Sequence, residues 1–190
     1  MHPTTMADLK KLITQCSKGD SRAQRSLYDL LKGRMMGICL RYCKDHEEAQ
    51  DIFQEAMIRL FKNMDKALKV DNFEAWARRI VINRAIDYYN KRNADRLISL
   101  EDSEAGQFSQ DDVTVLDELG AGEIISLVRE LPENQMLVFN LYVVDGYAHK
   151  EIAEKLRIQE SSSRTLLTRA KKGLVSMLQK LEVGEREYGS

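Results

Sequence analysis

Apolar residues recur at intervals of three and four along most of the 190-residue chain, and this spacing constrains its fold more than any other feature. Residues three or four positions apart lie on one face of an α-helix, so each stripe predicts an amphipathic helix that packs against a neighbour. The sequence lacks runs of alternating apolar and polar residues between turn residues, the pattern of a half-buried strand. We therefore expect an all-α protein.

The stripes divide the first half of the chain into expected helices. These cover residues 6–17, 20–31, 35–43, 47–66 and 72–90, and the second begins at a cap formed by Asp20 or Ser21. The last has the strongest helical pattern, with Phe73, Ala77 and Val81 on one face. Trp76 belongs to the same face, which favours a core position for it over an exposed one that stacks on bases.

An interruption separates two helical parts of the chain. Between residues 95 and 122 the periodicity fails, and serine, glycine and acidic residues accumulate. Residues 96–126 hold 1 basic and 8 acidic residues, whereas residues 1–95 hold 18 and 13, and residues 127–190 hold 10 and 9. We expect a flexible acidic linker over 96–126 that joins two small helical domains, 1–95 and 127–182, with a polar tail over 183–190.

The composition excludes several classes of protein. No apolar run approaches the roughly 20 residues of a membrane span, and the N-terminus lacks the basic and apolar segments of a secretory signal. We expect a cytoplasmic protein without membrane insertion of its own. Cys16, Cys39 and Cys43 are odd in number and have no disulfide spacing, which favours reduced thiols. Cys39, Cys43 and His46 lack a fourth ligand, so core packing is favoured over a metal site, and we expect no cofactor.

Residues 146–172 have the pattern of a helix-turn-helix. After the turn pair Asp145-Gly146, one helix places Ile152 and Ala153 inward, and residues 157–159 form a turn before a longer helix. Residues 156–180 hold six basic residues and one acidic residue, which favours a polyanionic partner such as the major groove of DNA. A helical hairpin with a solvated basic face has the same spacing, so spacing alone leaves both interpretations open.

The motifs resemble a known family when they are taken in order. Four segments of the chain resemble region 4 of extracytoplasmic-function (ECF) sigma factors: LPE at 131–133, DGY at 145–147, KEIAEKL at 150–156 and RAKK at 169–172. The region 2 core helix resembles EAQDIFQE at 48–55, and the adjoining promoter helix resembles FEAWARRI at 73–80 with NRAIDY at 83–88. The resemblance covers most of residues 20–95 and 127–180.

This resemblance implies an alternative bacterial sigma factor, an initiation subunit that is not itself an enzyme. Such a protein binds the RNA polymerase core through the clamp of the largest subunit and through the flap. Its region 2 melts the minus-ten promoter element, and its region 4 reads the minus-thirty-five element. The implied partners are the polymerase core, promoter DNA and an anti-sigma factor.

The resemblance also assigns roles to individual residues. Residues on one face of the 47–66 helix would bind the polymerase clamp, namely Asp51, Gln54, Glu55 and Arg59. Residues of the promoter helix would face minus-ten DNA, namely Asn83, Arg84, Asp87, Tyr88, Lys91 and Arg92. Residues 66–72 correspond to the loop that captures a flipped base. Residues of the second helix of the helix-turn-helix would contact minus-thirty-five DNA, namely Ser162, Arg164, Thr165, Thr168, Arg169 and Lys172.

Three departures from the family pattern leave the target promoter open. Leu166 stands where arginine or glutamine is frequent, which removes a possible DNA contact. Arg157 replaces a common turn glycine, which is tolerable where its φ is negative. A run of serines at 161–163 replaces a Gly-Thr-Val-like segment.

Other interpretations account for less of the chain. The acidic linker is either a mimic of RNA in a basic channel or a soluble tether, and the sequence favours neither. A one-component DNA-binding regulator would explain only the helix-turn-helix. A nucleic-acid enzyme would need paired acids, a phosphate-binding loop or a metal-ligand cluster, and the sequence has none of these.

Overall fold

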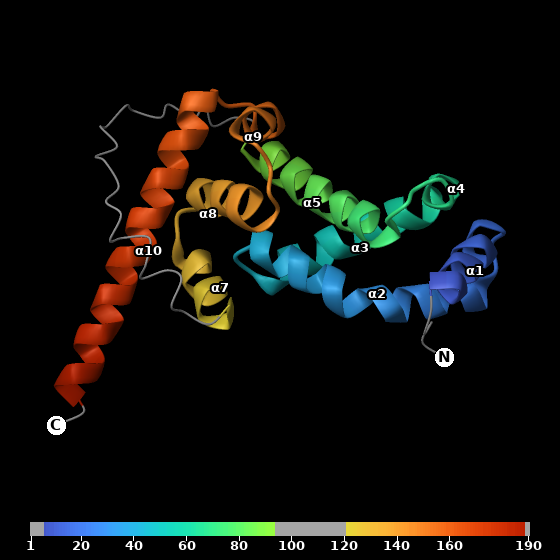
Figure 1. Ribbon diagram of the computed structural model, residues 1–190, viewed down its shortest axis with the longest axis horizontal. Coiled ribbons are helices and arrows are strands. Elements are labelled where there is room, and N and C mark those ends of the chain that lie inside the picture. Colours follow the sequence, from blue (N-terminus) through green and yellow to red (C-terminus); the bar gives the residue numbers. More distant parts are fainter. Residues whose placement is uncertain (1–5, 94–120, 189–190) are drawn as a thin grey trace. The chain divides into compact units, whose positions relative to one another are not determined.

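The computed structural model describes residues 6–93 and 121–188, which form helices with no strand among them (Figure 1). The sequence prediction of an all-α protein is confirmed for these residues. They belong to two compact units, an N-terminal unit and a C-terminal unit. The expected linker lies outside the described residues up to residue 120. No helix in the described ranges is long and apolar enough to cross a membrane.

The N-terminal unit has an apolar core between its three long helices. Its elements are α1 (Met6–Ser17), α2 (Ser21–Tyr42), α3 (His46–Lys62), α4 (Met64–Ala67) and α5 (Phe73–Arg92). Helices α2, α3 and α5 pack on one another, and α1 packs on α2 and α4. The largest fully buried side chains of this unit are Leu27, Met35, Ile52, Leu60 and Ile82.

Helix α2 is one continuous helix, so the prediction of separate helices over 20–31 and 35–43 was wrong. Gly33 and Gly37 lie within it, and each destabilises a helix interior by roughly 0.5–1 kcal/mol relative to alanine. Both glycines are exposed, and the buried stripe continues past them on the other side of the helix, in the order Leu27, Leu31, Met35, Ile38, Cys39 and Tyr42. Burial of this stripe outweighs the cost of the glycines, because packing contributes more to helix stability than propensity does.

Side-chain caps mark the beginnings of the three long helices of this unit. Asp20 accepts hydrogen bonds from the backbone of Arg22 and Ala23, and Asn72 accepts one from Ala75. The predicted 47–66 helix ends at Lys62, and the single turn α4 follows it.

The C-terminal unit packs three shorter elements along one long helix. It consists of α7 (Ala121–Glu130), α8 (Glu133–Phe139), the π-helical turn η1 (Asn140–Val144), α9 (His149–Leu156) and α10 (Glu160–Tyr188). Helices α7, α8 and α9 contact α10. Gly173 permits a close approach to Leu131, because a Cβ at this glycine would lie 2.9 Å from Leu131 Cδ2. The largest fully buried side chains are Leu131, Met136, Leu137, Leu141, Ile152, Leu166 and Leu174.

The limits of two sequence-predicted segments differ from the structure. Residues 121–126 are the beginning of α7, although the sequence placed them in the linker. Residues 183–188 continue α10, although the sequence placed them in a polar tail. Both stretches contain glycine and acidic residues, and this composition is more typical of linkers and tails than of helices.

We expect Asp45→Ala to destabilise the N-terminal unit by about 1 kcal/mol. The Asp45 carboxylate accepts a hydrogen bond of 2.7 Å from the backbone N–H of Glu48, and alanine cannot accept it. The measurement is urea denaturation followed by the fluorescence of Trp76, the single tryptophan of the chain. Asp45→Asn keeps an acceptor at the cap and is the control. Equal midpoints for both variants would contradict this role.

Candidate functional site

The exposed side of α3 carries the four residues that the sequence assigned to polymerase binding. Asp51, Gln54, Glu55 and Arg59 are all exposed, whereas Ile52, Phe53, Ala56 and Leu60 are buried on the opposite side. The exposed Ile58 adds apolar surface to the same side, with 54% of its area accessible. Sequence reasoning missed Ile58, and its position four residues after Gln54 was the available signal.

Residues predicted for two different surfaces form one ion-pair network between α3 and α5. The Arg84 guanidinium pairs with the Glu55 carboxylate, and Arg59 Nη1 lies 3.0 Å from Asp87 Oδ2. Arg84 Nη1 is also 4.0 Å from Asp87 Oδ2. The Arg84 side chain is only 18% exposed, and its Nε is buried without a hydrogen-bond partner among the described residues. Because its partners are about half exposed, each pair contributes little stability, and the network mainly fixes the direction of Arg84.

The last turns of α5 hold a second group of charges. Arg92 pairs with Glu48 of α3 and lies over the ring of Tyr88, with 5.9 Å between the guanidinium carbon and the ring centroid. Burial and then the Glu48 carboxylate raise the pKa of the Tyr88 hydroxyl. Asn83 and Lys91 are exposed on the same helix. The role of Glu48 was missed, because no local spacing links it to a residue 44 positions away.

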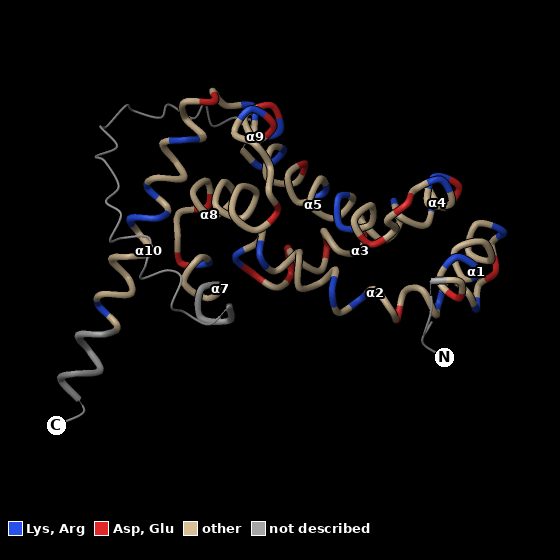
Figure 2. The backbone as a smooth tube through the Cα atoms, viewed as in Figure 1, with Lys and Arg blue, Asp and Glu red and all other residues tan. Residues whose placement is uncertain are grey.

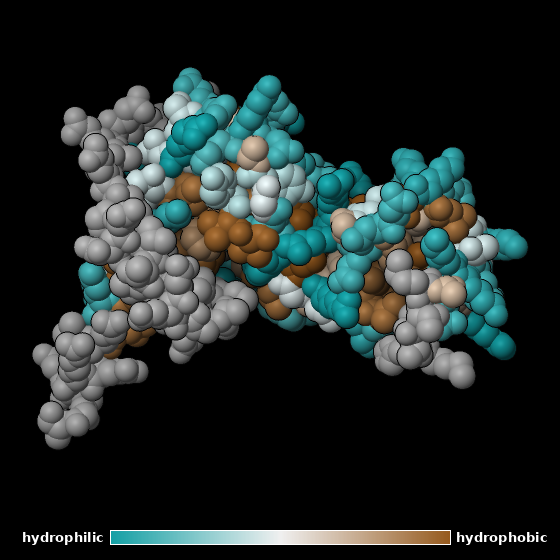
Figure 3. Space-filling model, in the orientation of Figure 1, coloured by the Kyte–Doolittle hydropathy of each residue, from teal (hydrophilic) through white to brown (hydrophobic). Residues whose placement is uncertain are grey.

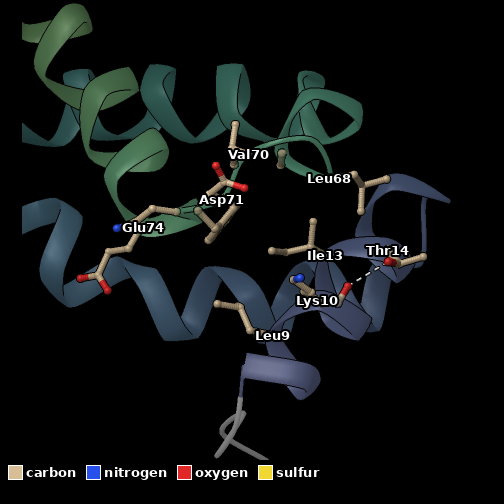
Figure 4. A pocket seen from close by; sticks show the side chains of 11 residues that line it. Leu9, Lys10, Ile13, Thr14, Leu68, Val70, Asp71 and Glu74 are labelled. Carbon is tan, nitrogen blue, oxygen red and sulfur yellow. Dashed lines mark hydrogen bonds between the residues drawn. The ribbon is translucent and has the colours of Figure 1, made fainter.

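A pocket of about 520 Å³ lies beside the segment that the sequence assigned to base capture (Figure 4). Leu9 and Ile13 of α1 point toward the segment that carries Val70 and Asp71. Figure 3 shows apolar surface framed by hydrophilic side chains in this part of the unit. The lining residues are Leu9, Lys10, Ile13, Thr14, Ala67, Leu68, Val70, Asp71, Asn72, Phe73 and Glu74. Trp76 is half-buried and packs on Phe73, with ring centroids 5.7 Å apart, so it lies at the edge of the core.

Helix α9 and the start of α10 form the predicted helix-turn-helix. The Glu151 carboxylate accepts a hydrogen bond of 2.8 Å from the backbone N–H of Ala148, which caps α9. Helix α9 ends at Arg157, where φ is 57°, and Ile158 N–H donates to the Ala153 carbonyl. The condition under which the sequence analysis treats arginine at this turn as tolerable, a negative φ, is therefore not met. The closed turn requires a left-handed residue, and a non-glycine residue there stores strain of about 1 kcal/mol.

Helix α10 separates a buried stripe from a polar face. The buried stripe consists of Ser163, Leu166, Leu167, Ala170 and Leu174. Leu166 is only 2% exposed, so the interpretation of this position as a lost DNA contact was wrong, because the side chain packs in the core. The other predicted residues lie at least partly in solvent, Arg164 exposed and the rest half-buried, namely Ser162, Thr165, Thr168, Arg169 and Lys172.

Local contacts hold the first turns of the α10 polar face. Arg164 Nη2 lies 2.6 Å from Glu160 Oε1, and the Thr168 hydroxyl donates to the Arg164 carbonyl at 3.1 Å. Figure 2 shows basic residues spaced along this helix. This face can therefore present cations and hydroxyl groups to a polyanion.

A buried polar contact joins the two helices of this motif. His149 Nδ1 lies 2.9 Å from Ser163 Oγ, and the Tyr142 ring stacks on the imidazole with centroids 4.4 Å apart. Burial and then the nearby Arg164 lower the pKa of His149. Sequence reasoning noted Ser163 only as part of the serine run at 161–163 and did not pair it with His149, since nothing in the spacing of 14 residues marks a contact.

The cysteines belong to the core of the N-terminal unit. Burial raises the pKa of Cys16 to about 11 and the pKa values of Cys39 and Cys43 to about 12, so all three remain thiols at neutral pH. Within residues 6–93 and 121–188, no group of three or more histidine, cysteine or acidic side chains is placed to hold a metal ion.

Comparisons with known proteins match both units. The family model described as Sigma-70 region 2 matches residues 27–94, and the model described as Sigma-70, region 4 matches residues 121–174. The ECF RNA polymerase sigma factor SigW of Bacillus subtilis is 29% identical over 183 residues, which cover 91% of this chain and 98% of that protein.

Other relatives have similar coverage. The RNA polymerase sigma-H factor of Pseudomonas aeruginosa is 26% identical, over 90% of this chain and 94% of that protein. The ECF RNA polymerase sigma-E factor of Escherichia coli is 24% identical, with the same two coverages of 90% and 94%. A solved structure of CnrH in complex with the cytosolic domain of CnrY has a TM-score of 0.46 and 18% identity, over 90% of this chain and 97% of that chain.

We expect the C-terminal unit to lose stability as the pH falls below about 6.5, the usual pKa of histidine. The folded state lowers the pKa of His149, so the unfolded chain binds the proton more readily and acid favours unfolding. The measurement is thermal unfolding by circular dichroism at about pH 7.5 and 5.5. His149→Phe should reduce the difference between the two midpoints. An undiminished difference in this variant would contradict the assignment.

Proposed function

Because this chain belongs to the sigma-70 family, as an ECF sigma factor that directs promoter-specific transcription initiation, we propose that its two units divide polymerase and promoter recognition between them. The N-terminal unit binds the polymerase core and the minus-ten element. The C-terminal unit binds the minus-thirty-five element. The observation that carries this proposal is that the nominated side chains of α3 and α10 lie on the solvent side of helices whose other side is buried.

The exposed side of α3 binds the clamp of the largest polymerase subunit. Asp51, Gln54, Glu55 and Arg59 supply polar and charged contacts, and Ile58 supplies an apolar one at the centre. An exposed apolar side chain enclosed by polar ones suits a protein partner. The link between Arg84 and Glu55 makes Arg84 a support for this surface as well as a candidate for DNA contact.

The polar side of α5 and the adjoining pocket bind the minus-ten element. Asn83, Arg84, Asp87, Tyr88, Lys91 and Arg92 supply cations for phosphates and an aromatic ring for stacking. The pocket beside residues 66–72 has apolar walls and polar side chains at its edge, which suits an unstacked base.

The start of α10 reads the minus-thirty-five element in the major groove. Arg164 and Arg169 can form two hydrogen bonds each with guanine or bind phosphates, and Ser162, Thr165, Thr168 and Lys172 extend the contact. Adjacent to it, Tyr142, Val143 and Val144 are each 40–49% exposed. Three consecutive exposed apolar residues suit a protein surface, and we assign them to the polymerase flap.

The protein then acts in the bacterial cytoplasm as an initiation subunit without a catalytic site of its own. An anti-sigma factor that covers the α3 or α10 surface would hold it inactive. A one-component regulator with the same helix-turn-helix would not require the α3 surface, so binding to the polymerase core separates the two functions.

The direct test is reconstitution of the full chain with bacterial core polymerase on a library of promoter fragments, followed by run-off transcription. We expect transcripts from a subset of fragments that share an upstream and a downstream element. Absence of specific initiation with every competent core enzyme tested would exclude these roles. Specific DNA binding without core binding would instead favour the one-component regulator.

We expect Asp51→Arg to weaken core binding about tenfold or more, because it reverses the charge of one side chain in the proposed clamp contact. Binding to duplex upstream DNA should not change. Core affinity can be measured by fluorescence anisotropy of the labelled chain. Asp65→Arg, an equal charge reversal at an exposed position of α4, is the matched control. Equal losses in both variants would show that only net charge matters.

Arg164→Ala and Arg169→Ala should have the converse effect. Each should cost about 1–3 kcal/mol of binding to upstream DNA if the arginine contacts a base, and core binding should not change. Binding of the holoenzyme to a selected upstream duplex measures the loss. The exposed Lys180, in a more distal turn of α10, gives the control Lys180→Ala. Loss of core binding in the arginine variants would mean that the roles are misassigned.

A further inference from the structure

The His149–Ser163 contact is unusual because of where it lies. Asn140, His149 and Ser163 are the only buried polar side chains, apart from tyrosine and cysteine, in the part of the chain for which side chains are described. Two of these three bond to each other, with 9% of His149 and 0% of Ser163 exposed. The bond crosses from the first turn of α9 to the first turn of α10.

A polar pair at this position is not required for stability. Burial of two polar groups costs free energy that their hydrogen bond only offsets, and two apolar side chains of similar shape would pack as well. A hydrogen bond differs from apolar packing because it is directional. Apolar packing tolerates small rotations of a helix, whereas a bond of 2.9 Å between two fixed side chains is lost when one helix rotates.

A directional bond at this place restricts how far the first turn of α10 can rotate about the helix axis. Successive helix residues are turned by about 100°, so the direction of Ser163 sets the directions of Ser162, Arg164 and Thr165. These neighbours are three of the residues proposed to read DNA. Thr165 lies almost opposite Ser163 on the helix, which turns it away from α9 when Ser163 faces α9.

The surroundings of His149 hold the imidazole in one orientation. Tyr142 of η1 stacks on the ring with an angle of 21° between the planes. Arg164, Glu160 and Lys171 are the charged residues near enough to affect the ring. A neutral imidazole has one donor and one acceptor nitrogen. The Ser163 hydroxyl can therefore donate to Nδ1 or accept from it, depending on the tautomer.

We propose that His149 and Ser163 are positioning residues that set the rotation of α10 and thereby sharpen its discrimination between upstream DNA sequences. This inference rests on the proposed minus-thirty-five function. Neither side chain touches DNA in this scheme. They act through the residues on either side of Ser163.

The test uses the full chain bound to core polymerase and two duplexes, one selected by the wild-type holoenzyme from a library randomised at the upstream element and one scrambled. The variants are Ser163→Ala, which removes one oxygen, and His149→Phe combined with Ser163→Ala, which leaves no buried group unpaired. His149→Asn places an amide near the position of Nδ1, where it can still bond to Ser163. This variant should therefore keep part of the wild-type ratio of affinities for the two duplexes. Ser176→Ala, at an exposed serine of α10, is the matched control.

We expect both variants to lower the ratio of affinities for the selected and scrambled duplexes by about three- to tenfold, the range that one net hydrogen bond implies. Affinity for the scrambled duplex, core binding and the thermal midpoint of the double variant should not fall. An unchanged ratio in both variants would overturn the proposal. A parallel fall in both affinities with a lower midpoint would also overturn it, since the contact would then serve stability alone. If the wild-type holoenzyme selects no upstream sequence, the proposed function itself fails.

Discussion

In the described part of the chain, the long helices each bury an apolar stripe against a neighbour, because tertiary packing supplies most of the stability of a helix in a protein. That constraint also decides which residues can meet a partner. In α3, burial of Ile52, Ala56 and Leu60 turns Asp51, Gln54 and Glu55 to solvent, since the two sets lie on opposite sides of the helix. In α10, burial of Leu167, Ala170 and Leu174 does the same for Arg164 and Thr168. The proposed functional surfaces are thus what remains exposed after the core has formed.

The ion pairs between α3 and α5 connect surfaces that a residue-by-residue assignment keeps apart. Arg84 was assigned to DNA and Glu55 to polymerase, yet they pair with each other. Arg59 and Asp87 pair in the same way, across the same two helices. Substitution of either member of a pair therefore changes both surfaces, and the effects of two substitutions in the network will not add. Under the proposed roles, binding to polymerase and binding to minus-ten DNA are physically coupled wherever a partner competes for one of these four side chains.

The sequence predicts best where one local rule is sufficient. Helix α1 has the predicted limits, and the Asp20 cap is at the predicted place. Predictions were wrong where tertiary packing prevailed: Gly33 and Gly37 do not break α2, and Leu166 lies in the core. The positive φ of Arg157 follows from the closed turn rather than from the residue type. The His149–Ser163 contact and the Arg92–Glu48 pair depend on where two helices meet, which no local pattern encodes. The roles of the site residues in polymerase and promoter binding remain predictions.

The two units differ in how they use buried polarity, and the difference matches their proposed tasks. Among residues 7–93 no polar residue other than tyrosine and cysteine is buried as a whole, although Arg84 Nε is buried, whereas the buried residues Asn140, His149 and Ser163 all lie in the C-terminal unit. A clamp contact made by long exposed side chains tolerates small helix movements, because those side chains can adjust. Discrimination between base pairs does not tolerate such movements, since a contact of two hydrogen bonds with guanine requires the arginine and the base edge to be aligned. A directional bond beneath the start of α10 is therefore of most use in the unit that we propose to read sequence in a rigid groove.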